Sequence, residues 1–98
     1  MRQIVRFKFS SPLARDDIED DVCLAIFCCE CLHGKPRVRL EVAGYLVSED
    51  GRSCVLDVRG PAGEDAARIL AGLSSARVGD ESLKVERVIP RMPAEVGL

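Results

Sequence analysis

Clustered cysteines are the residues of this chain best suited to chemistry. Four of the five lie within nine positions, at Cys23, Cys28, Cys29 and Cys31, and the fifth is Cys54. Cys28 and Cys31 form a C-x-x-C pair, and His33 follows two positions later. Thiolates and imidazoles bind zinc and other soft ions, so Cys28, Cys31 and His33 are the candidate metal ligands. A strong zinc signal would include a second C-x-x-C or an H-x-x-H pair, which the sequence lacks.

Dithiol chemistry would need a lowered thiol pKa at Cys28 or Cys31. Active C-x-x-C pairs lie at a helix N-terminus, where the helix dipole stabilises the thiolate. The pattern around Cys28 predicts the last turns of a helix, where the dipole has the opposite effect. We therefore expect these cysteines to act as small hydrophobic residues. A metal-binding or thiol-redox protein that uses Cys28 and Cys31 is the alternative hypothesis.

His33 is the only histidine, so any acid–base mechanism at neutral pH would depend on it. It follows a predicted helix, and no carboxylate or nucleophile lies at a fixed spacing from it, so we expect a capping or surface role. The sequence also lacks the G-x-S-x-G, H-E-x-x-H, Walker and Rossmann motifs. We predict no catalytic residue and no cofactor, and a small enzyme acting at a dimer cleft is a second alternative.

Composition and charge narrow the class of partner. The 98 residues suffice for one hydrophobic core, and a net charge of −2 gives no general attraction to nucleic acid or to anionic lipid. The N-terminal stretch alternates charged and apolar residues, unlike a signal peptide or a membrane span. An odd number of clustered cysteines also differs from a secreted disulfide framework. We expect a cytoplasmic protein with reduced thiols and no nucleic-acid or membrane partner.

The clearest structural pattern is the period-two alternation over Arg37–Gly60, which predicts a β-hairpin. Residues 48–52 suit a three-residue loop with Gly51 in the left-handed conformation. Such a loop would pair Leu46 with Cys54. It would place one set of residues on the core face: Leu40, Val42, Leu46, Cys54, Leu56 and Val58.

The remaining segments predict two further strands and two helices. The strands span Gln3–Phe9 and Leu83–Ile89, and the second helix runs from Glu64 to about Ser75. Ser10, Ser11 and Pro12 predict the start of the first helix, which ends at His33 before Gly34. Its core stripe comprises Ile18, Val22, Ala25, Ile26, Cys29 and Leu32. Residues 60–63 predict a turn that leads into the second helix. We expect no anion site there, because Glu64 and Asp65 would repel an anion at the N-terminus of that helix.

The order β-α-β-β-α-β predicts a ferredoxin-like α+β sandwich. It would have a four-stranded antiparallel sheet in the order 4-1-3-2 with two helices on one face. Residues 1–90 would form this single domain, and residues 91–98 a flexible tail. In the order of its elements, the stretch 3–89 resembles small regulatory and ligand-binding modules such as amino-acid-sensing domains. The resemblance is one of topology alone, and the hypothesis of a binding role rests on the missing catalytic motifs and on two apolar surfaces.

Two surfaces are candidates for that role. One is the sheet face without helices, where we place Arg6, Tyr45, Val47, Val55 and Asp57. The other is the back of the first helix, with Leu24 and Phe27, for which the second helix or the tail would otherwise provide cover. The central strands offer no aromatic residue on the free face, which excludes an RNA-recognition domain. We predict a non-catalytic module that binds a small ligand or a protein, with a homodimer through the sheet face as one expectation.

Overall fold

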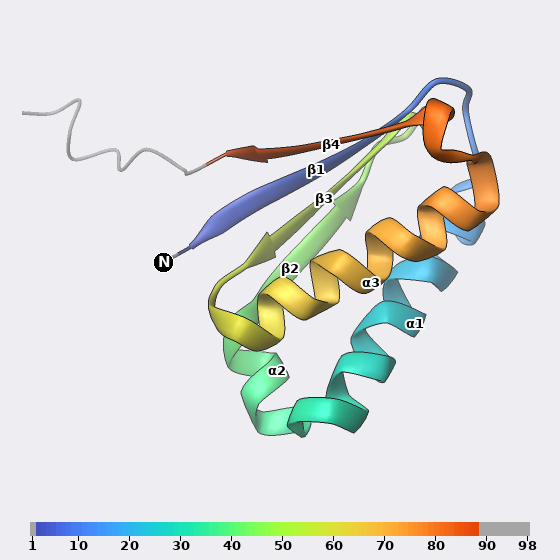
Figure 1. The fold of residues 1–98 in the computed structure, drawn as a ribbon. Helices are drawn as coiled ribbons and strands as arrows, with labels where there is room; N and C mark the ends of the chain where they lie inside the picture. Colours follow the sequence, from blue (N-terminus) through green and yellow to red (C-terminus); the bar gives the residue numbers. More distant parts are fainter. Residues whose placement is uncertain (1, 89–98) are drawn as a thin grey trace, which may run out of the picture.

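The computed structural model describes residues 2–88, and the structural statements below concern this part of the chain. Its elements, in chain order, are β1 (Gln3–Phe9), α1 (Arg15–His33), α2 (Lys35–Glu41), β2 (Val42–Val47), β3 (Ser53–Val58), α3 (Gly60–Val78), the 3₁₀ turn η1 (Asp80–Ser82) and β4 (Leu83–Val88). The strands form one antiparallel sheet in the order β2-β3-β1-β4, which confirms the predicted order counted from the opposite edge. α1 and α3 cover one face, and α2 joins α1 to β2 at one end (Figure 1). The predicted tail, residues 91–98, lies outside the described residues.

The core lies between the sheet and the inner stripes of α1 and α3. Alternate residues of β1 and β3 are buried, as predicted: Val5, Phe7, Phe9, Cys54, Leu56 and Val58. They pack with Ile18, Val22, Ala25 and Cys29 of α1 and with Ala66 and Leu70 of α3. Each large side chain buried in this way contributes about 1.5–3 kcal/mol. Leu32, predicted to be in the core, is 71% exposed, because Cys29 is the last buried residue of α1.

The segment Lys35–Glu41 is a third helix and not the first strand of the hairpin, which corrects the prediction of two helices. Pro36 lies in the first turn of α2, where its missing N–H costs nothing. Leu40, predicted to lie on the core face, is 72% exposed, because in a helix it points away from Val38, which is 2% exposed.

The β2–β3 hairpin is also shifted by one residue from the predicted register. Val47 pairs with Cys54, and Leu46 pairs with Val55. The loop has four residues and not three, because Ser53 N–H donates to Ser48 Oγ at 3.0 Å and Ser48 N–H donates to Ser53 O at 3.0 Å. Asp50 Oδ1 accepts hydrogen bonds from Ser48 Oγ and from Arg52 N–H, which fixes the longer loop. A β-bulge between Val42 and Gly44 restores the predicted pairing of Val42 with Val58.

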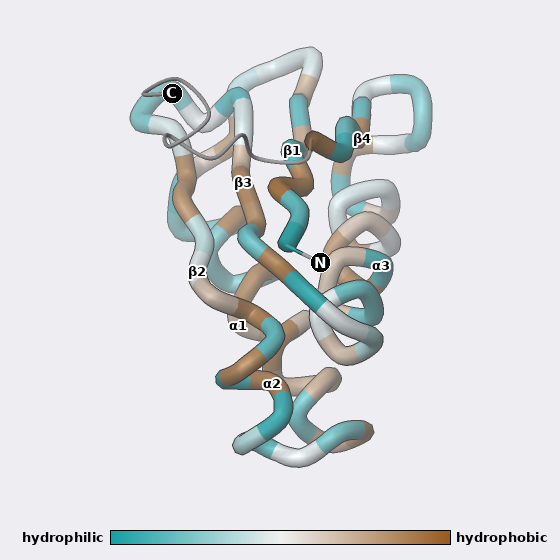
Figure 2. Tube along the Cα trace, turned by 90° about the vertical axis from the view of Figure 1, so that its left-hand side faces the viewer, coloured by the Kyte–Doolittle hydropathy of each residue, from teal (hydrophilic) through white to brown (hydrophobic). Residues whose placement is uncertain are grey.

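Both long helices begin at other residues than predicted. α1 begins at Arg15 and not at Pro12, since Leu13 N–H donates to Gly51 O at 2.9 Å and ties this segment to the hairpin loop. α3 begins at Gly60, so the residues 60–63 predicted as a turn form its first turn. β2 and β4 are the two edges of the sheet (Figure 2).

Candidate functional site

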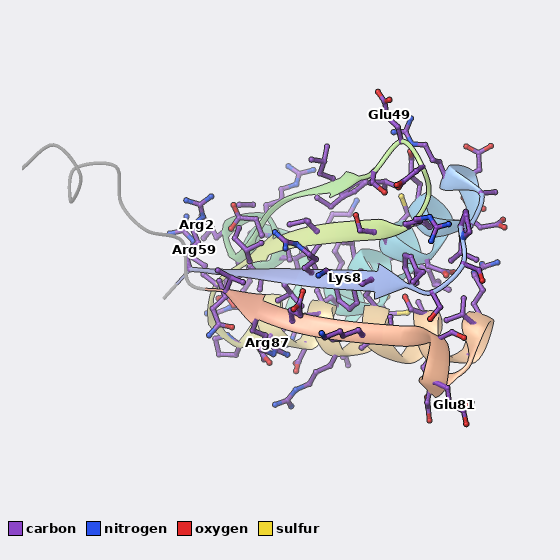
Figure 3. All side chains as sticks on the ribbon, turned by 90° about the horizontal axis from the view of Figure 1, so that it is seen from above. Arg2, Lys8, Glu49, Arg59, Glu81 and Arg87 are labelled. Carbon is purple, nitrogen blue, oxygen red and sulfur yellow. The ribbon has the colours of Figure 1, made fainter. Side chains whose placement is uncertain are left out.

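The sheet face opposite the helices is open within the described residues. Strand alternation places these side chains on it: Ile4, Arg6, Lys8, Gly44, Leu46, Val55, Asp57, Lys84, Glu86 and Val88. We call this surface the open face. Figure 3 looks onto it, with Lys8 near its middle and Arg2 and Arg59 at one end. Three predicted site residues, Arg6, Val55 and Asp57, lie together on its central strands.

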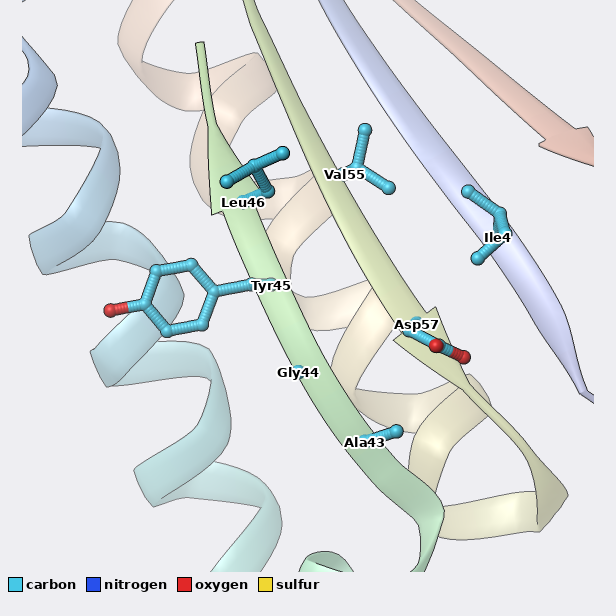
Figure 4. A pocket seen from close by; sticks show the side chains of 7 residues that line it. All are labelled: Ile4, Ala43, Gly44, Tyr45, Leu46, Val55 and Asp57. Carbon is cyan, nitrogen blue, oxygen red and sulfur yellow. The ribbon is translucent and has the colours of Figure 1, made fainter. Parts of the chain in front are cut away.

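The other two predicted residues of this surface lie elsewhere. The one-residue shift of the hairpin turns Val47 into the core, where it is 5% exposed, and Tyr45 toward α1 (Figure 4). Partial burial, followed by the nearby Cys23 and Glu19, raises the pKa of the Tyr45 hydroxyl. Leu46 takes their place on the open face and is 70% exposed. The sequence pattern assigns Leu46 to the core and not to the open face, because the face on which Leu46 lies depends on the length of the hairpin loop.

The charges of the open face are unevenly paired. Arg2 makes a bidentate contact with Asp57, at 2.9 Å from Nε to Oδ1 and 2.7 Å from Nη2 to Oδ2. Lys8 Nζ lies 3.0 Å from Glu86 Oε1, and this hydrogen bond lowers the pKa of Glu86. Arg6 stands between these two pairs on the central strand β1. Its cross-strand neighbour on β4 is Glu86, whose pKa it helps to lower. Arg6 nevertheless makes no ion pair or side-chain hydrogen bond with residues 2–88, which leaves its N–H donors available to an anion.

A shallow hollow of about 250 Å³ is lined in part by Val55, the cross-strand neighbour of Arg6. Its lining comes from three neighbouring strands: Ile4, Ala43, Gly44, Tyr45, Leu46, Val55 and Asp57 (Figure 4). Gly44 forms its floor, since a Cβ atom built there would meet no atom within 4 Å. The open face therefore combines a free cation with an apolar recess.

The back of α1 is the second predicted surface, and the described residues do not cover it. Leu24 is 46% exposed and Phe27 is 60% exposed. Cys23 and Cys31 on the same helix are also exposed. Of the two predicted covers, the second long helix does not provide it, because α3 packs against the opposite, inner side of α1, and the tail lies outside the described residues.

The cysteines divide between core and surface. Cys29 is buried, with Sγ 2.9 Å from the carbonyl oxygen of Ala62, and burial raises its thiol pKa. Burial also raises the pKa of Cys54 to about 11. Cys28 is half-buried and Cys31 is exposed. Among residues 2–88, no three His, Cys, Asp or Glu side chains come together as a metal site.

His33 has a partner that its position in the sequence did not reveal. Its Nε2 lies 2.8 Å from Oδ2 of Asp65 on α3, 32 residues away. The pair joins the end of α1 to the start of α3. No nucleophilic side chain is hydrogen-bonded to His33 within the described residues, so the pair has the geometry of a helix–helix contact.

The start of α3 already holds a carboxylate, which is that of Glu41. Oε1 of Glu41 accepts a hydrogen bond from Ala62 N–H at 2.6 Å. A Cβ atom at Gly60 or at Gly63 would lie 2.5 Å from atoms of Glu41, so the two glycines permit this approach. The helix terminus is therefore occupied by a side chain of the protein itself, and an external anion would have to displace it.

Comparison with known proteins provides no further assignment. The sequence matches no protein-family model, and no curated protein is significantly similar to it. Within residues 2–88, no helix is both long and apolar enough to span a membrane.

Proposed function

We propose that the chain is a non-catalytic binding domain of ferredoxin-like topology, formed by residues 1–90 in the cytoplasm, whose open face binds a small carboxylate with a short aliphatic group. The observation that carries the proposal is that Arg6, which has no ion-pair partner among residues 2–88, is the cross-strand neighbour of Val55, one of the residues that line the apolar hollow. The order of elements, with both long helices on one face, supports the topology.

The charge of the open face favours an anion. It carries the cations Arg6, Lys8 and Lys84, with Arg2 at its end, against the carboxylates Asp57 and Glu86, although the whole chain has a net charge of −2. A carboxylate matches the planar fork of Arg6, which donates two parallel hydrogen bonds.

The hollow favours a small, partly apolar ligand. Ile4, Leu46 and Val55 supply aliphatic surface, and Gly44 leaves the space between them empty. The volume of about 250 Å³ is below the range of roughly 300–1,000 Å³ typical of sites for drug-sized molecules. A group of the size of an isobutyl side chain suits such a recess.

The ion pairs of the open-face carboxylates favour a binding role for this surface. Among residues 2–88, both carboxylates of the open face are held by cations, Asp57 by Arg2 and Glu86 by Lys8. General acid–base catalysis needs a group that can exchange a proton near the operating pH.

The exposed, unbridged thiols of Cys23 and Cys31 suit a reducing compartment, which is why we place the protein in the cytoplasm.

The test is a titration of ¹⁵N-labelled protein with isovalerate, followed by amide chemical shifts, with the uncharged isovaleramide as the matched ligand control. We expect saturable shifts at Ile4, Arg6 and Val55 with isovalerate only. Arg6→Ala should weaken binding by about tenfold or more, because a charge-assisted bidentate contact is lost. Arg68→Ala, which removes an exposed cation from α3, should bind as the wild type does. Equal binding of the amide, or undiminished binding by Arg6→Ala, would exclude the proposal.

A further inference from the structure

Strand β2 is an edge strand without the usual protection against pairing. It reads Val-Ala-Gly-Tyr-Leu-Val, with no charge and no proline. The opposite edge, β4, carries Lys84, Glu86 and Arg87 among its six residues. Charged side chains on an edge discourage pairing with other strands, so β4 is protected and β2 is not. Figure 2 shows β2 without the strong teal of charged residues.

The backbone of β2 has free hydrogen-bonding groups on its outer side. Ser48 N–H donates to Ser53 O, which makes these two residues a hydrogen-bonded pair of the ladder. Since such pairs alternate, Leu46 and Gly44 bond to β3, whereas Tyr45 and Val47 direct their N–H and C=O groups away from it. These groups have no hydrogen-bond partner within residues 2–88. Another strand would satisfy them.

We propose that the partner is a second copy of this chain, whose β2 pairs antiparallel with the first across a two-fold axis at Tyr45. This register places Tyr45 opposite Tyr45 and Leu46 opposite Gly44 of the copy. On the open face, the side chain of Leu46, which is 70% exposed, then lies against Gly44, which has no side chain to obstruct it. The dimer has one continuous eight-stranded sheet, and Leu46 of each copy closes the outer side of the other's hollow.

The charges at the two ends of β2 favour this antiparallel, symmetric arrangement. The hairpin tip after β2 carries Glu49 and Asp50 with Arg52, whereas α2 before it carries Lys35, Arg37 and Arg39 against one carboxylate, that of Glu41, which Arg37 and Ala62 N–H already hold. Glu49 and Arg39 are exposed and make no ion pair with residues 2–88. The two-fold axis brings the acidic tip of each copy beside α2 of the other. Parallel pairing would instead bring the two acidic tips together.

The exposed flank of α1 extends the same surface on the helix side. Cys23 lies beside Tyr45, and Phe27, one turn further along α1, is 60% exposed. Strand pairing alone buries little area, and stable interfaces bury about 1,200–2,000 Å². The flanks of the two α1 helices, with Leu24 and Phe27, supply the additional apolar area beneath the joined sheets. This dimer does not depend on the proposed ligand.

The test is the molar mass of the untagged chain by light scattering after gel filtration, over a concentration series in reductant. We expect a dimer for the wild type, and a dissociation constant raised by about tenfold or more for Leu46→Glu, which places two like charges diagonally across the axis and buries each beside β2 of the other copy. Val88→Glu is the matched control on the protected edge and should leave the dimer intact. A wild type that stays monomeric into the millimolar range overturns the proposal and leaves the edge to a strand of another protein. A dimer that tolerates Leu46→Glu overturns it as well.

A charge exchange tests the symmetry without disturbing the core. Glu49→Lys and Arg39→Glu should each weaken the dimer, and the double variant should restore it, because each tip then meets the opposite charge again. Circular dichroism of each variant confirms that the monomer remains folded. Failure of the double variant to recover dimerisation, with both single variants folded and weakened, contradicts the antiparallel arrangement.

Discussion

The carboxylate of Glu41 accepts a hydrogen bond from the backbone N–H of Ala62, at 2.6 Å. Glu41, at the end of α2, thus satisfies a backbone N–H at the start of α3 and places a negative charge at the positive end of the α3 helix dipole. Arg37 Nη1 lies 3.3 Å from the other oxygen of the same carboxylate. Glu41 therefore holds the seven-residue α2 in place against the longer helix.

Removal of this cap should destabilise the fold. We expect Glu41→Ala to lower the free energy of unfolding by about 1–2 kcal/mol, the cost of a lost helix cap. Urea denaturation followed by circular dichroism measures this difference. Glu81→Ala, at an exposed residue of η1, should change stability by less than about 0.5 kcal/mol. Equal effects of the two substitutions would show that the Glu41 contact contributes no stability.

Two glycines of α3 should respond to alanine in opposite directions. A Cβ atom at Gly63 would lie 2.5 Å from the carbonyl oxygen of Glu41 and 2.9 Å from Cβ of Val58, so Gly63→Ala should destabilise the protein by about 1–3 kcal/mol. At Gly72 no atom lies within 4 Å, and Gly72→Ala should stabilise it by roughly 0.5–1 kcal/mol through helix propensity. Thermal unfolding of both variants measures the two signs. The same sign for both would contradict the close packing of Gly63 against α2.

The predictable parts of this fold are those with long periodic patterns. The alternation in Gln3–Phe9 and the stripe of α1 repeat often enough to fix the buried face from the sequence. Lys35–Glu41 is too short for this: in seven residues, Val38 and Leu40 fit a strand as well as a helix. The hairpin register escaped prediction because the side chains of Ser48 and Asp50 extend the loop.

The candidate site was predicted in part for the same reasons. Arg6, Val55 and Asp57 were placed on the open face because β1 and β3 have regular patterns. The face on which Leu46 lies depends on the loop length, and the pattern assigned this residue to the core. Contacts between elements that lie far apart in the chain have no characteristic sequence spacing. For this reason the sequence did not predict the partner of His33, which is Asp65 on α3.

The ion pair between Arg77 and Asp21 should contribute more to stability than the exposed pairs. Arg77 donates to both oxygens of Asp21, at 2.8 and 3.0 Å, and these hydrogen bonds raise the pKa of Arg77. Asp21 is 8% exposed, so its carboxylate depends on this partner. We expect Arg77→Ala to lower the free energy of unfolding by about 1–2 kcal/mol, less than for a fully buried pair because Arg77 is partly solvated.

The control for this pair is Arg15→Ala. Arg15 lies 3.8 Å from Glu19, and both side chains are largely exposed. Surface pairs of this kind contribute about 0–1 kcal/mol. Urea unfolding of the two variants, under identical conditions, compares them. A larger loss for Arg15→Ala than for Arg77→Ala would contradict the ranking by burial.

The five thiols should fall into distinct classes of reactivity. Cys23 and Cys31 are exposed and should alkylate rapidly with iodoacetamide, whereas Cys29 and Cys54 are buried and their raised pKa values disfavour the thiolate. Peptide mass spectrometry after timed labelling at pH 8 resolves the sites. In urea, all five should react at similar rates. Fast labelling of Cys54 in the folded protein would contradict its burial, and unusually fast labelling of Cys28 would favour the thiol-redox alternative.

The pair of Lys8 and Glu86 predicts a pH dependence of stability on the open face. The hydrogen bond from Lys8 lowers the pKa of Glu86 in the folded protein, so the folded state binds this proton less readily than the unfolded state does. The contribution is therefore fully present above the unfolded pKa of about 4.3 and is lost as the pH falls through the lower, folded pKa. The difference in urea midpoint between the wild type and Glu86→Gln should be present at pH 7 and absent near pH 2. A difference that persists unchanged at the acidic end would show that Glu86 acts through packing and not through its charge.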